Sequence, residues 1–333
     1  MVCTVIVDGF YGDTGKGKVV SYLVTKDEAA IYVRAGVGPN AGHTVVKDEK
    51  TYKLRMVPCG FVNPNTLQLI GPGVLVNPDL VIKEIKETGI ESRFGIDPMC
   101  AIIEQKHILM DQSDDNLKNI VKTTGTGTGP CNADRVMRIA KLARDIPELK
   151  QFLMDVPALV NHALDEGRTV IVEGTQGTFI SLYYGQYPYV TSKDVCASAA
   201  CSDVGIGPTR VDEVVLVLKS YVTRVGGGEL DGEISHEEAQ KRGWDEYGTV
   251  TGRQRRAAPF SYSLAKRAAM INGATQIALT KIDILFPETK GVKNYEELRI
   301  EARAFVQRVE EELDIPVTLI GTGPGVEELI DRR

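Results

Sequence analysis

Several features of membrane, zinc-binding and secreted proteins are missing from this sequence. No run reaches the roughly 20 apolar residues that a membrane-spanning helix needs, and the N-terminus has no basic segment followed by a long apolar stretch. No two cysteines form a CxxC pair and no histidine lies at ligand spacing from a cysteine, so a zinc site is not expected. These absences predict a cytoplasmic, reduced protein. The cysteines are Cys3, Cys59, Cys100, Cys131, Cys196 and Cys201.

Basic residues are also fewer than acidic residues. The chain has 39 Lys and Arg against 45 Asp and Glu, a net charge of −6, whereas nucleic-acid-binding proteins are normally basic. An acidic protein that binds anions must concentrate its positive charge locally. The densest such place is Arg253–Arg256, and the lack of aromatic residues within that run also disfavours nucleic acid.

The sequence does contain strands that alternate with helices. A strand is predicted at Val2–Val7, followed by a glycine-containing loop and a helical segment at Lys18–Leu23. Further buried strands are predicted at Thr169–Val172, Val214–Leu218, Ile277–Thr280 and Val317–Ile320, and helices at Ala158–Glu166, Tyr262–Ile271 and Tyr295–Leu313. The alternation predicts an α/β fold with a mainly parallel central sheet flanked by helices. Because no repeat or linker is visible, residues 1–333 are expected to form one domain with elaborated loops.

The 33 glycines gather in a few loops. Directly after the first predicted strand, Gly12–Lys18 fits the pattern GxxxxGK, in which glycines let N–H groups converge on phosphate oxygens. Val19 stands where a P-loop has the Ser or Thr that binds Mg²⁺, and Asp13 could replace that ligand. The alternative is a glycine-rich turn with solvated lysines.

A second glycine-rich loop, Gly36–Thr44, contains Asn40 and His43. Of the four histidines, only His43 lies in such a loop, where it could act as a general acid. Taken alone, a histidine that caps a backbone group in a turn is the more common case.

Three further loops carry hydroxyl and amide groups. They are Thr123–Pro130, Glu173–Thr178 and Tyr187–Ser192. Alternating threonine and glycine in the first would present hydroxyls and amides to an anion, although a flexible loop is equally consistent. Gln176 in the second offers a donor and an acceptor that could read the edge of a base.

The remaining motifs lie in the C-terminal third. In Thr249–Arg256, Thr-x-Thr-Gly precedes arginines whose forked guanidinium groups bind carboxylate or phosphate; a solvated basic stretch is the alternative. Thr280–Asp283, at the end of a predicted strand, resembles the [NT]KxD element that reads guanine in GTP-binding proteins, because Asp283 can accept from N1–H and the 2-amino group. Gly321–Pro324 also follows a predicted strand and could cover the base.

Together these segments resemble the adenylosuccinate synthetase family in its compact archaeal-type form. GDxGKGK, NAGHT, TTGxGxGP, EGxQGT, YPYVTS, TGRxRR and TKxD occur in the family's order, between about residue 3 and residue 324. The resemblance implies a P-loop-like GTP-binding architecture and a carbon–nitrogen ligase that joins IMP to L-aspartate. Its products are adenylosuccinate, GDP and phosphate, formed through 6-phosphoryl-IMP in the first committed step from IMP to AMP. The resemblance also implies that the protein needs Mg²⁺ as a cofactor and forms a homodimer.

The resemblance assigns roles residue by residue. Asp13 would take the proton from N1 of IMP, His43 would donate to the β–γ bridge of GTP, and Asp13 and the carbonyl of Gly42 would hold Mg²⁺. GTP would be bound by Gly12, Asp13, Thr14, Gly15, Lys16, Gly17, Lys18, Gly42, His43, Thr44, Arg255, Lys281, Ile282, Asp283, Gly321, Thr322 and Gly323. IMP would be bound by Asp13, Lys16, Asn40, Ala41, Gly42, His43, Thr124, Gln176, Thr191, Arg253 and, from the neighbouring subunit, Arg138. Aspartate would be bound by Thr249, Val250, Thr251, Gly252, Arg253, Gln254 and Arg255.

Five positions depart from the family's usual motifs, and they bear on secondary contacts to phosphate and aspartate. They are Thr14, Pro39, Thr126, Val250 and Gln254.

Two other functions would use some of the same loops. A regulatory GTPase would share the phosphate loop and the TKID element but has no need of the other anion loops, and a nucleotide kinase needs no arginines for a carboxylate.

Overall fold

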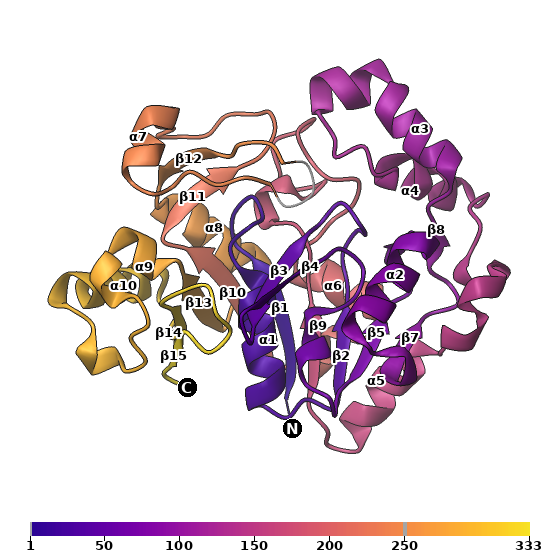
Figure 1. Cartoon of the computed structure of the whole chain (residues 1–333), viewed down its shortest axis with the longest axis horizontal. Coiled ribbons are helices and arrows are strands. Elements are labelled where there is room, and N and C mark those ends of the chain that lie inside the picture. The colour runs from indigo at the N-terminus through magenta and orange to yellow at the C-terminus, as the bar shows by residue number, and fades with distance from the viewer. Residues whose placement is uncertain (1, 249–251) are drawn as a thin grey trace.

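The computed structural model describes residues 2–248 and 252–333. A nine-stranded sheet runs through these residues (Figure 1), and its strands are parallel except for β15 at one edge. In spatial order the strands are β15 (Leu329–Asp331), β14 (Val317–Gly321), β13 (Gln276–Thr280), β10 (Glu213–Lys219), β1 (Cys3–Asp8), β9 (Val170–Glu173), β2 (Ile31–Arg34), β5 (Leu67–Ile70) and β7 (Phe94–Ile96). The predicted α/β fold with a mainly parallel sheet is confirmed.

Helices cover both faces of the sheet, and each face has its own apolar core. Every residue of β1 is buried, as expected for a central parallel strand. Its side chains alternate: Cys3, Val5 and Val7 pack in one core cluster and Ile6 in the other. The first cluster takes residues from α5, α6, α8 and α10, and the second from α1 and α2. The helices named here are α1 (Lys16–Lys26), α2 (Pro78–Thr88), α5 (Val156–Asp165), α6 (Ala197–Val204), α8 (Tyr262–Asn272) and α10 (Ile300–Leu313).

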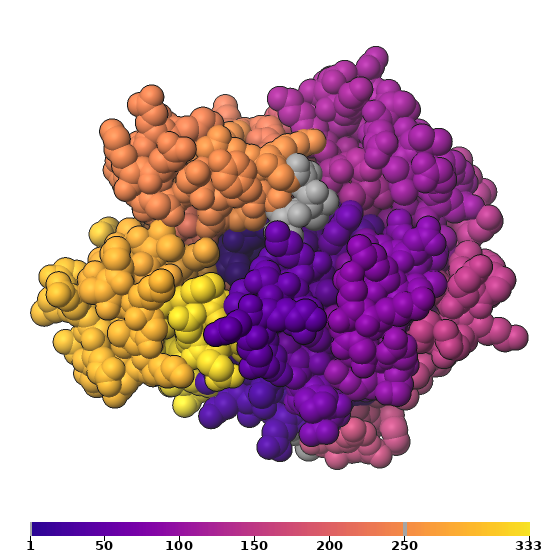
Figure 2. Space-filling model, in the orientation of Figure 1, coloured from indigo at the N-terminus to yellow at the C-terminus, as the bar shows by residue number. Residues whose placement is uncertain are grey.

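Smaller elements stand over the carboxyl edge of the sheet in two groups, which can be followed by their colours in the ribbon (Figure 1) and in the space-filling view (Figure 2). One group contains α7 (His236–Lys241) and the antiparallel pair β11 (Tyr221–Arg224) and β12 (Arg256–Pro259); the other contains α3 (Gln105–Ser113) and α4 (Thr128–Met137). The remaining strands and α-helix of the described residues are the hairpin β3 (His43–Lys47) and β4 (Lys50–Leu54), the pair β6 (Leu75–Val76) and β8 (Ala101–Ile102), and the short helix α9 (Ile282–Leu285). Within residues 2–248 and 252–333, no helix is both long and apolar enough to cross a membrane.

The strand order places several loops side by side. β1 pairs with β10 on one side and with β9 on the other. Since these strands and β13, β14 and β2 are parallel, the loops that follow them all leave from one edge, where ligands collect in open α/β sheets. Five of the predicted binding motifs are in these loops.

The bounds of two predicted segments were wrong. The helix predicted at Tyr295–Leu313 begins only at Ile300, because Tyr295–Glu297 form a 3₁₀ turn and Leu298 is extended. Leu298 is buried all the same, so its apolar side chain fitted the helical pattern without belonging to the helix. The loop predicted at Thr123–Pro130 ends early, because α4 starts at Thr128.

Candidate active site

The phosphate loop, which is the Gly12–Lys18 motif between β1 and α1, is held in place by hydrogen bonds to Asp8. This buried carboxylate, the last residue of β1, accepts hydrogen bonds from the amides of Phe10 (2.9 Å), Gly12 (3.1 Å) and Thr14 (3.2 Å). It also accepts from the Thr14 hydroxyl and pairs with Lys16 Nζ at 2.9 Å. Sequence reasoning missed Asp8, although its place as the last residue before a glycine-rich loop was a usable signal.

Backbone geometry explains the residue types in this loop. Gly12, Asp13 and Gly15 all have positive φ, at 91°, 60° and 92°, a region that glycine enters freely and aspartate more readily than most residues. Across from the loop, a Cβ on Gly177 would lie 2.2 Å from the Gly12 nitrogen. The segment after β9 therefore approaches the loop backbone closely, and Lys16 Nζ also donates to the Gln176 carbonyl at 2.6 Å.

Three segments expected to bind GTP meet beside α1. Lys18 Nζ donates to the Gly323 carbonyl at 2.5 Å. Burial lowers the pKa of Lys18 to about 8, while the neighbouring Asp283 and Glu328 act to raise it. The phosphate loop, the TKID segment and the Gly321–Gly323 loop are thus brought together, although they are distant in sequence.

Asp283 is not at the end of a strand as predicted. β13 ends at Thr280, Lys281 has a φ of 61°, and Asp283 lies in the first turn of α9. Its Oδ1 is buried and has no hydrogen-bond partner among the described residues. Burial also raises the pKa of its carboxyl group. A buried acceptor without a donor costs free energy, so this carboxylate is suited to a ligand that brings N–H groups.

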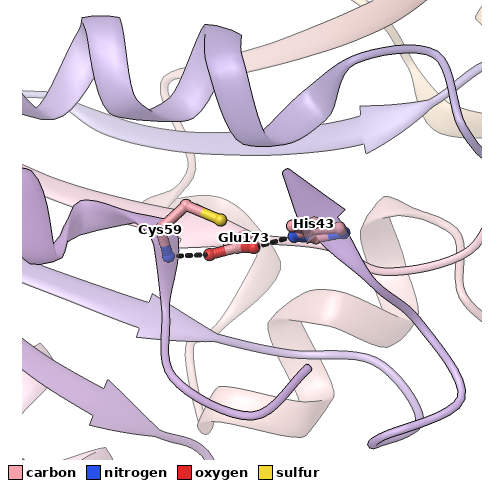
Figure 3. A group of neighbouring side chains, drawn as sticks. All are labelled: His43, Cys59 and Glu173. Carbon is pink, nitrogen blue, oxygen red and sulfur yellow. Dashed lines mark hydrogen bonds and ion pairs between the residues drawn. The ribbon is translucent and has the colours of Figure 1, made fainter. Parts of the chain in front are cut away.

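His43 is held by Glu173 (Figure 3). Glu173 Oε1 pairs with His43 Nδ1, and the same carboxylate accepts from Tyr32 Oη (2.8 Å), the Cys59 amide (2.9 Å) and Arg34 Nη1 (3.2 Å). A carboxylate can only accept, which assigns the proton to Nδ1 and leaves Nε2 for a ligand. Burial opposes ionisation of Glu173, but His43 and Arg34 outweigh it and lower its pKa to about 2. Burial lowers the pKa of His43 more than the Glu173 carboxylate raises it, and Arg34 and Lys16 also act to lower it.

The ligand atoms of His43, Cys59 and Glu173 lie within 4.8 Å of one another, close enough for a metal ion. The spacing of cysteines and histidines in the sequence gave no sign of this proximity. However, the oxygens of Glu173 already accept four donors, and burial and the charge of Glu173 raise the pKa of the Cys59 thiol far above its usual value. The arrangement is that of a carboxylate orienting a histidine.

Three residues expected to bind IMP contact one another. Gln176 Nε2 donates to Asn40 Oδ1 at 2.8 Å, and Asn40 Nδ2 donates to Thr191 Oγ1 at 3.2 Å. They come from loops after β2, after β9 and before α6, which are up to 151 residues apart. A fourth, Thr124, bonds the hydroxyl of Thr126 at 2.9 Å in the loop before α4.

The Arg253–Arg256 run does not form one basic patch. Arg253 is exposed and donates to the carbonyls of Lys122 (2.7 Å) and Thr123 (2.9 Å). Arg256 pairs with Glu233 at 3.0 Å. Arg255 is buried, and its Nη2 lies 3.0 Å from Asp13 Oδ2. A solvated stretch is therefore the wrong description of Arg255. Thr249, Val250 and Thr251 lie outside the described residues.

Arg138 is at the exposed C-terminal end of α4, with a φ of 66°. Its sequence neighbours Val136, Met137 and Ile139 are also exposed. Three large apolar side chains around one arginine form a surface that a partner could cover.

Comparisons with known proteins agree on one family. A family model described as adenylosuccinate synthetase matches residues 5–148 and 139–288. The adenylosuccinate synthetases of Methanosphaera stadtmanae and Methanocaldococcus jannaschii are each 52% identical to the chain over 336 residues, covering all of it and 98% and 97% of those proteins.

Two solved structures share the fold. Fully ligated adenylosuccinate synthetase from Plasmodium falciparum matches with a TM-score of 0.91 and 24% identity over 99% of both chains. Cyanophage S-2L succinoaminodeoxyadenylate synthetase, bound to dGMP and dATP, matches with a TM-score of 0.83 and 24% identity, over 99% of this chain and 95% of the other.

Proposed function

Because this chain belongs to the adenylosuccinate synthetase family, we propose that it joins IMP to L-aspartate with GTP in two steps at one site. The observation that carries this proposal is the convergence of loops suited to three different ligands on one edge of the sheet. The phosphate loop and Asp283 suit GTP, the group of Asn40, Gln176 and Thr191 suits IMP, and Arg255 suits a carboxylate. A switch GTPase has no use for the second and third of these sets.

In the first step, O6 of IMP takes the γ-phosphoryl group of GTP and becomes a leaving group. Asp13 accepts the N1 proton of IMP, which makes O6 nucleophilic. Lys16 and the loop amides stabilise the charge that develops on the phosphates. His43 donates from Nε2 toward the β–γ bridge, and Glu173 supports the imidazolium by holding Nδ1–H. Phosphate charge near the ring would counter the effect of burial on the pKa of His43.

In the second step, the amine of aspartate displaces phosphate from C6 of 6-phosphoryl-IMP. A carboxylate of aspartate pairs with Arg255, which in this structure contacts Asp13. Arg253, two residues before Arg255, donates hydrogen bonds to backbone carbonyls of the loop that contains Thr124. Binding of aspartate at Arg255 would therefore also affect the residue that acts as the base.

The residues at this site suit Mg²⁺, which prefers hard oxygen ligands. One carboxylate oxygen of Asp13 pairs with Arg255, and the side chain remains 29% exposed beside the phosphate loop. Asp13 and the Gly42 carbonyl would hold the ion. When bound, Mg²⁺ would neutralise charge on the transferring phosphoryl group.

Two properties of the molecule belong to the same proposal. The chain forms a homodimer in which Arg138 reaches the IMP site of the neighbouring subunit, which is supported by the exposed apolar residues on either side of it. The protein works in the cytoplasm, which is supported by six buried cysteines that are all free thiols.

One assay tests the proposal. GTP, Mg²⁺, IMP and aspartate are mixed, and the absorbance change of substitution at purine C6 is followed while each component is omitted in turn. We expect turnover only with all four. GTP hydrolysis without IMP would indicate a GTPase instead, and a stable phosphorylated nucleotide formed without aspartate would indicate a kinase.

A further inference from the structure

Glu246 lies among cations over the sheet edge and is outside every motif considered so far. It lies between α7 and β12 and precedes the Thr249–Arg256 motif, which is called the substrate loop below, and its side chain is 13% exposed. Oε2 pairs with Lys219 Nζ at 3.0 Å and with Arg255 Nη1. Oε1 accepts from Tyr221 Oη and lies 3.7 Å from Lys281 Nζ. A single carboxylate thus contacts the segments that end β10, start β11 and follow β13.

The substrate loop is tied to the same residue through its backbone. The Arg255 amide donates to the Glu246 carbonyl at 2.8 Å, and Gln254 Nε2 donates to Asp245 Oδ1 at 2.8 Å. These bonds fix the second half of the loop against the segment that contains Glu246. The position of Arg255 therefore depends on Glu246 through both main chain and side chain.

The two ends of the Arg255 guanidinium have different partners. Nη1 pairs with Glu246 and Nη2 pairs with Asp13. An arriving carboxylate can replace Asp13 at Nη2 while Glu246 keeps Nη1 in place. The guanidinium would then turn about its Nη1 end and remain in the site, and Asp13 would lose its contact with Arg255.

Formal charges in this cluster favour an anionic ligand. Lys219, Arg255 and Lys281 bring three positive charges, against two negative charges on Glu246 and Asp13. Burial disfavours ionisation of Glu246, but the three cations outweigh it and hold the pKa of its carboxyl well below the usual range. Glu246 keeps the cations close together and still leaves one positive charge for a substrate.

We propose that Glu246 is a positioning residue for aspartate, which fixes Arg255 by its Nη1 end and lets the substrate exchange with Asp13 at Nη2. The proposal rests on the ligase function proposed above. Through Lys281, the same carboxylate links the substrate loop to the segment that contains Asp283.

Glu246→Gln tests the proposal, because the amide keeps the volume of the side chain but removes its charge. We expect the aspartate KM to rise roughly tenfold to a hundredfold, as for the loss of a charge-assisted hydrogen bond. The IMP KM should stay within about threefold, and Glu246→Asp should recover part of the loss. Glu310→Gln is the matched control, since Glu310 also bonds an arginine (Arg332, 2.8 Å) and a backbone amide but lies far from the site.

The outcomes separate the two proposals. If the wild type does not form adenylosuccinate, the ligase function is wrong. If the wild type does and folded Glu246→Gln keeps its aspartate KM within twofold, or raises the KM values of all three substrates equally, Glu246 does not position Arg255 for aspartate. Should Glu246→Gln fail to fold, Tyr221→Phe removes one hydrogen bond to Glu246 and keeps the ring that stacks on Trp244. That variant must then raise the aspartate KM selectively, by about threefold, and an unchanged value would overturn the proposal.

Discussion

Replacing Glu173 by glutamine should uncouple His43 from the reaction and also weaken the fold. The side chain is fully buried, and its carboxylate accepts hydrogen bonds from Tyr32, Arg34, Cys59 and His43. An amide has one acceptor oxygen and turns two donors toward groups that also donate. The variant thus leaves the buried Arg34 guanidinium without its counter-charge.

The cost in stability follows from linkage. The pKa of Glu173 is about 2 in the folded protein against an ordinary value of 4.5. At about 1.4 kcal/mol per unit of pKa, the charged interactions stabilise the fold by about 3 kcal/mol, close to the roughly 3–5 kcal/mol lost when one partner of a buried ion pair is removed. Because the folded pKa is the lower one, this stabilisation is fully present above about pH 4.5 and is lost as the pH falls toward 2. The difference between wild type and variant should therefore shrink as the pH falls below 4.5.

The effect on catalysis should be larger than that on binding. Without the carboxylate, Nδ1 has no fixed proton and the imidazolium loses its counter-charge, so kcat should fall roughly a hundredfold or more, with small changes in the KM values for GTP and IMP. Urea unfolding at several pH values and steady-state kinetics measure the two effects.

A matched control separates stability from catalysis. Glu84→Gln alters another buried carboxylate, which accepts from the amides of Arg55, Met56 and Val57; it should lower stability and leave kcat nearly unchanged. A kcat within threefold of wild type in folded Glu173→Gln would refute a role through His43. If the loss of stability in Glu173→Gln did not become smaller below pH 4.5, the lowered pKa of Glu173 would not be its cause.

Asp13→Asn should keep GTP binding and abolish turnover, because an amide cannot accept the N1 proton; activity within tenfold of wild type would exclude Asp13 as the base. Asp283→Asn should no longer use GTP as phosphoryl donor and should use XTP instead, because the amide donates to the 2-oxo group of xanthine. Wild type should prefer GTP over ATP by about 10⁴-fold. Normal use of GTP by that variant, with XTP still excluded, would show that Asp283 does not read the base. Arg138→Leu mixed with Asp13→Ala should recover some activity, because one hybrid site holds both wild-type residues. No recovery despite demonstrated subunit exchange would argue against a shared site.

Much of the fold could be predicted because its signals are local. The apolar run of β1 and the glycines at positions 12 and 15 act within a few residues of chain, and the structure has a buried strand and positive φ values there. The strands β2, β5 and β7 were not predicted. That residues 1–333 form one domain stays a prediction.

The family and the loops that hold candidate residues could be predicted from the sequence, because motif order and glycine spacing are properties of the chain itself. Which charged side chains contact one another depends on how the chain folds. Glu173 is 130 residues from His43, and Glu246 is 27 residues from Lys219 and 9 from Arg255, separations that have no periodic signature. A buried carboxylate is stable only where several donors surround it, and those donors come together only when the parallel strands align their carboxyl ends at one edge of the sheet.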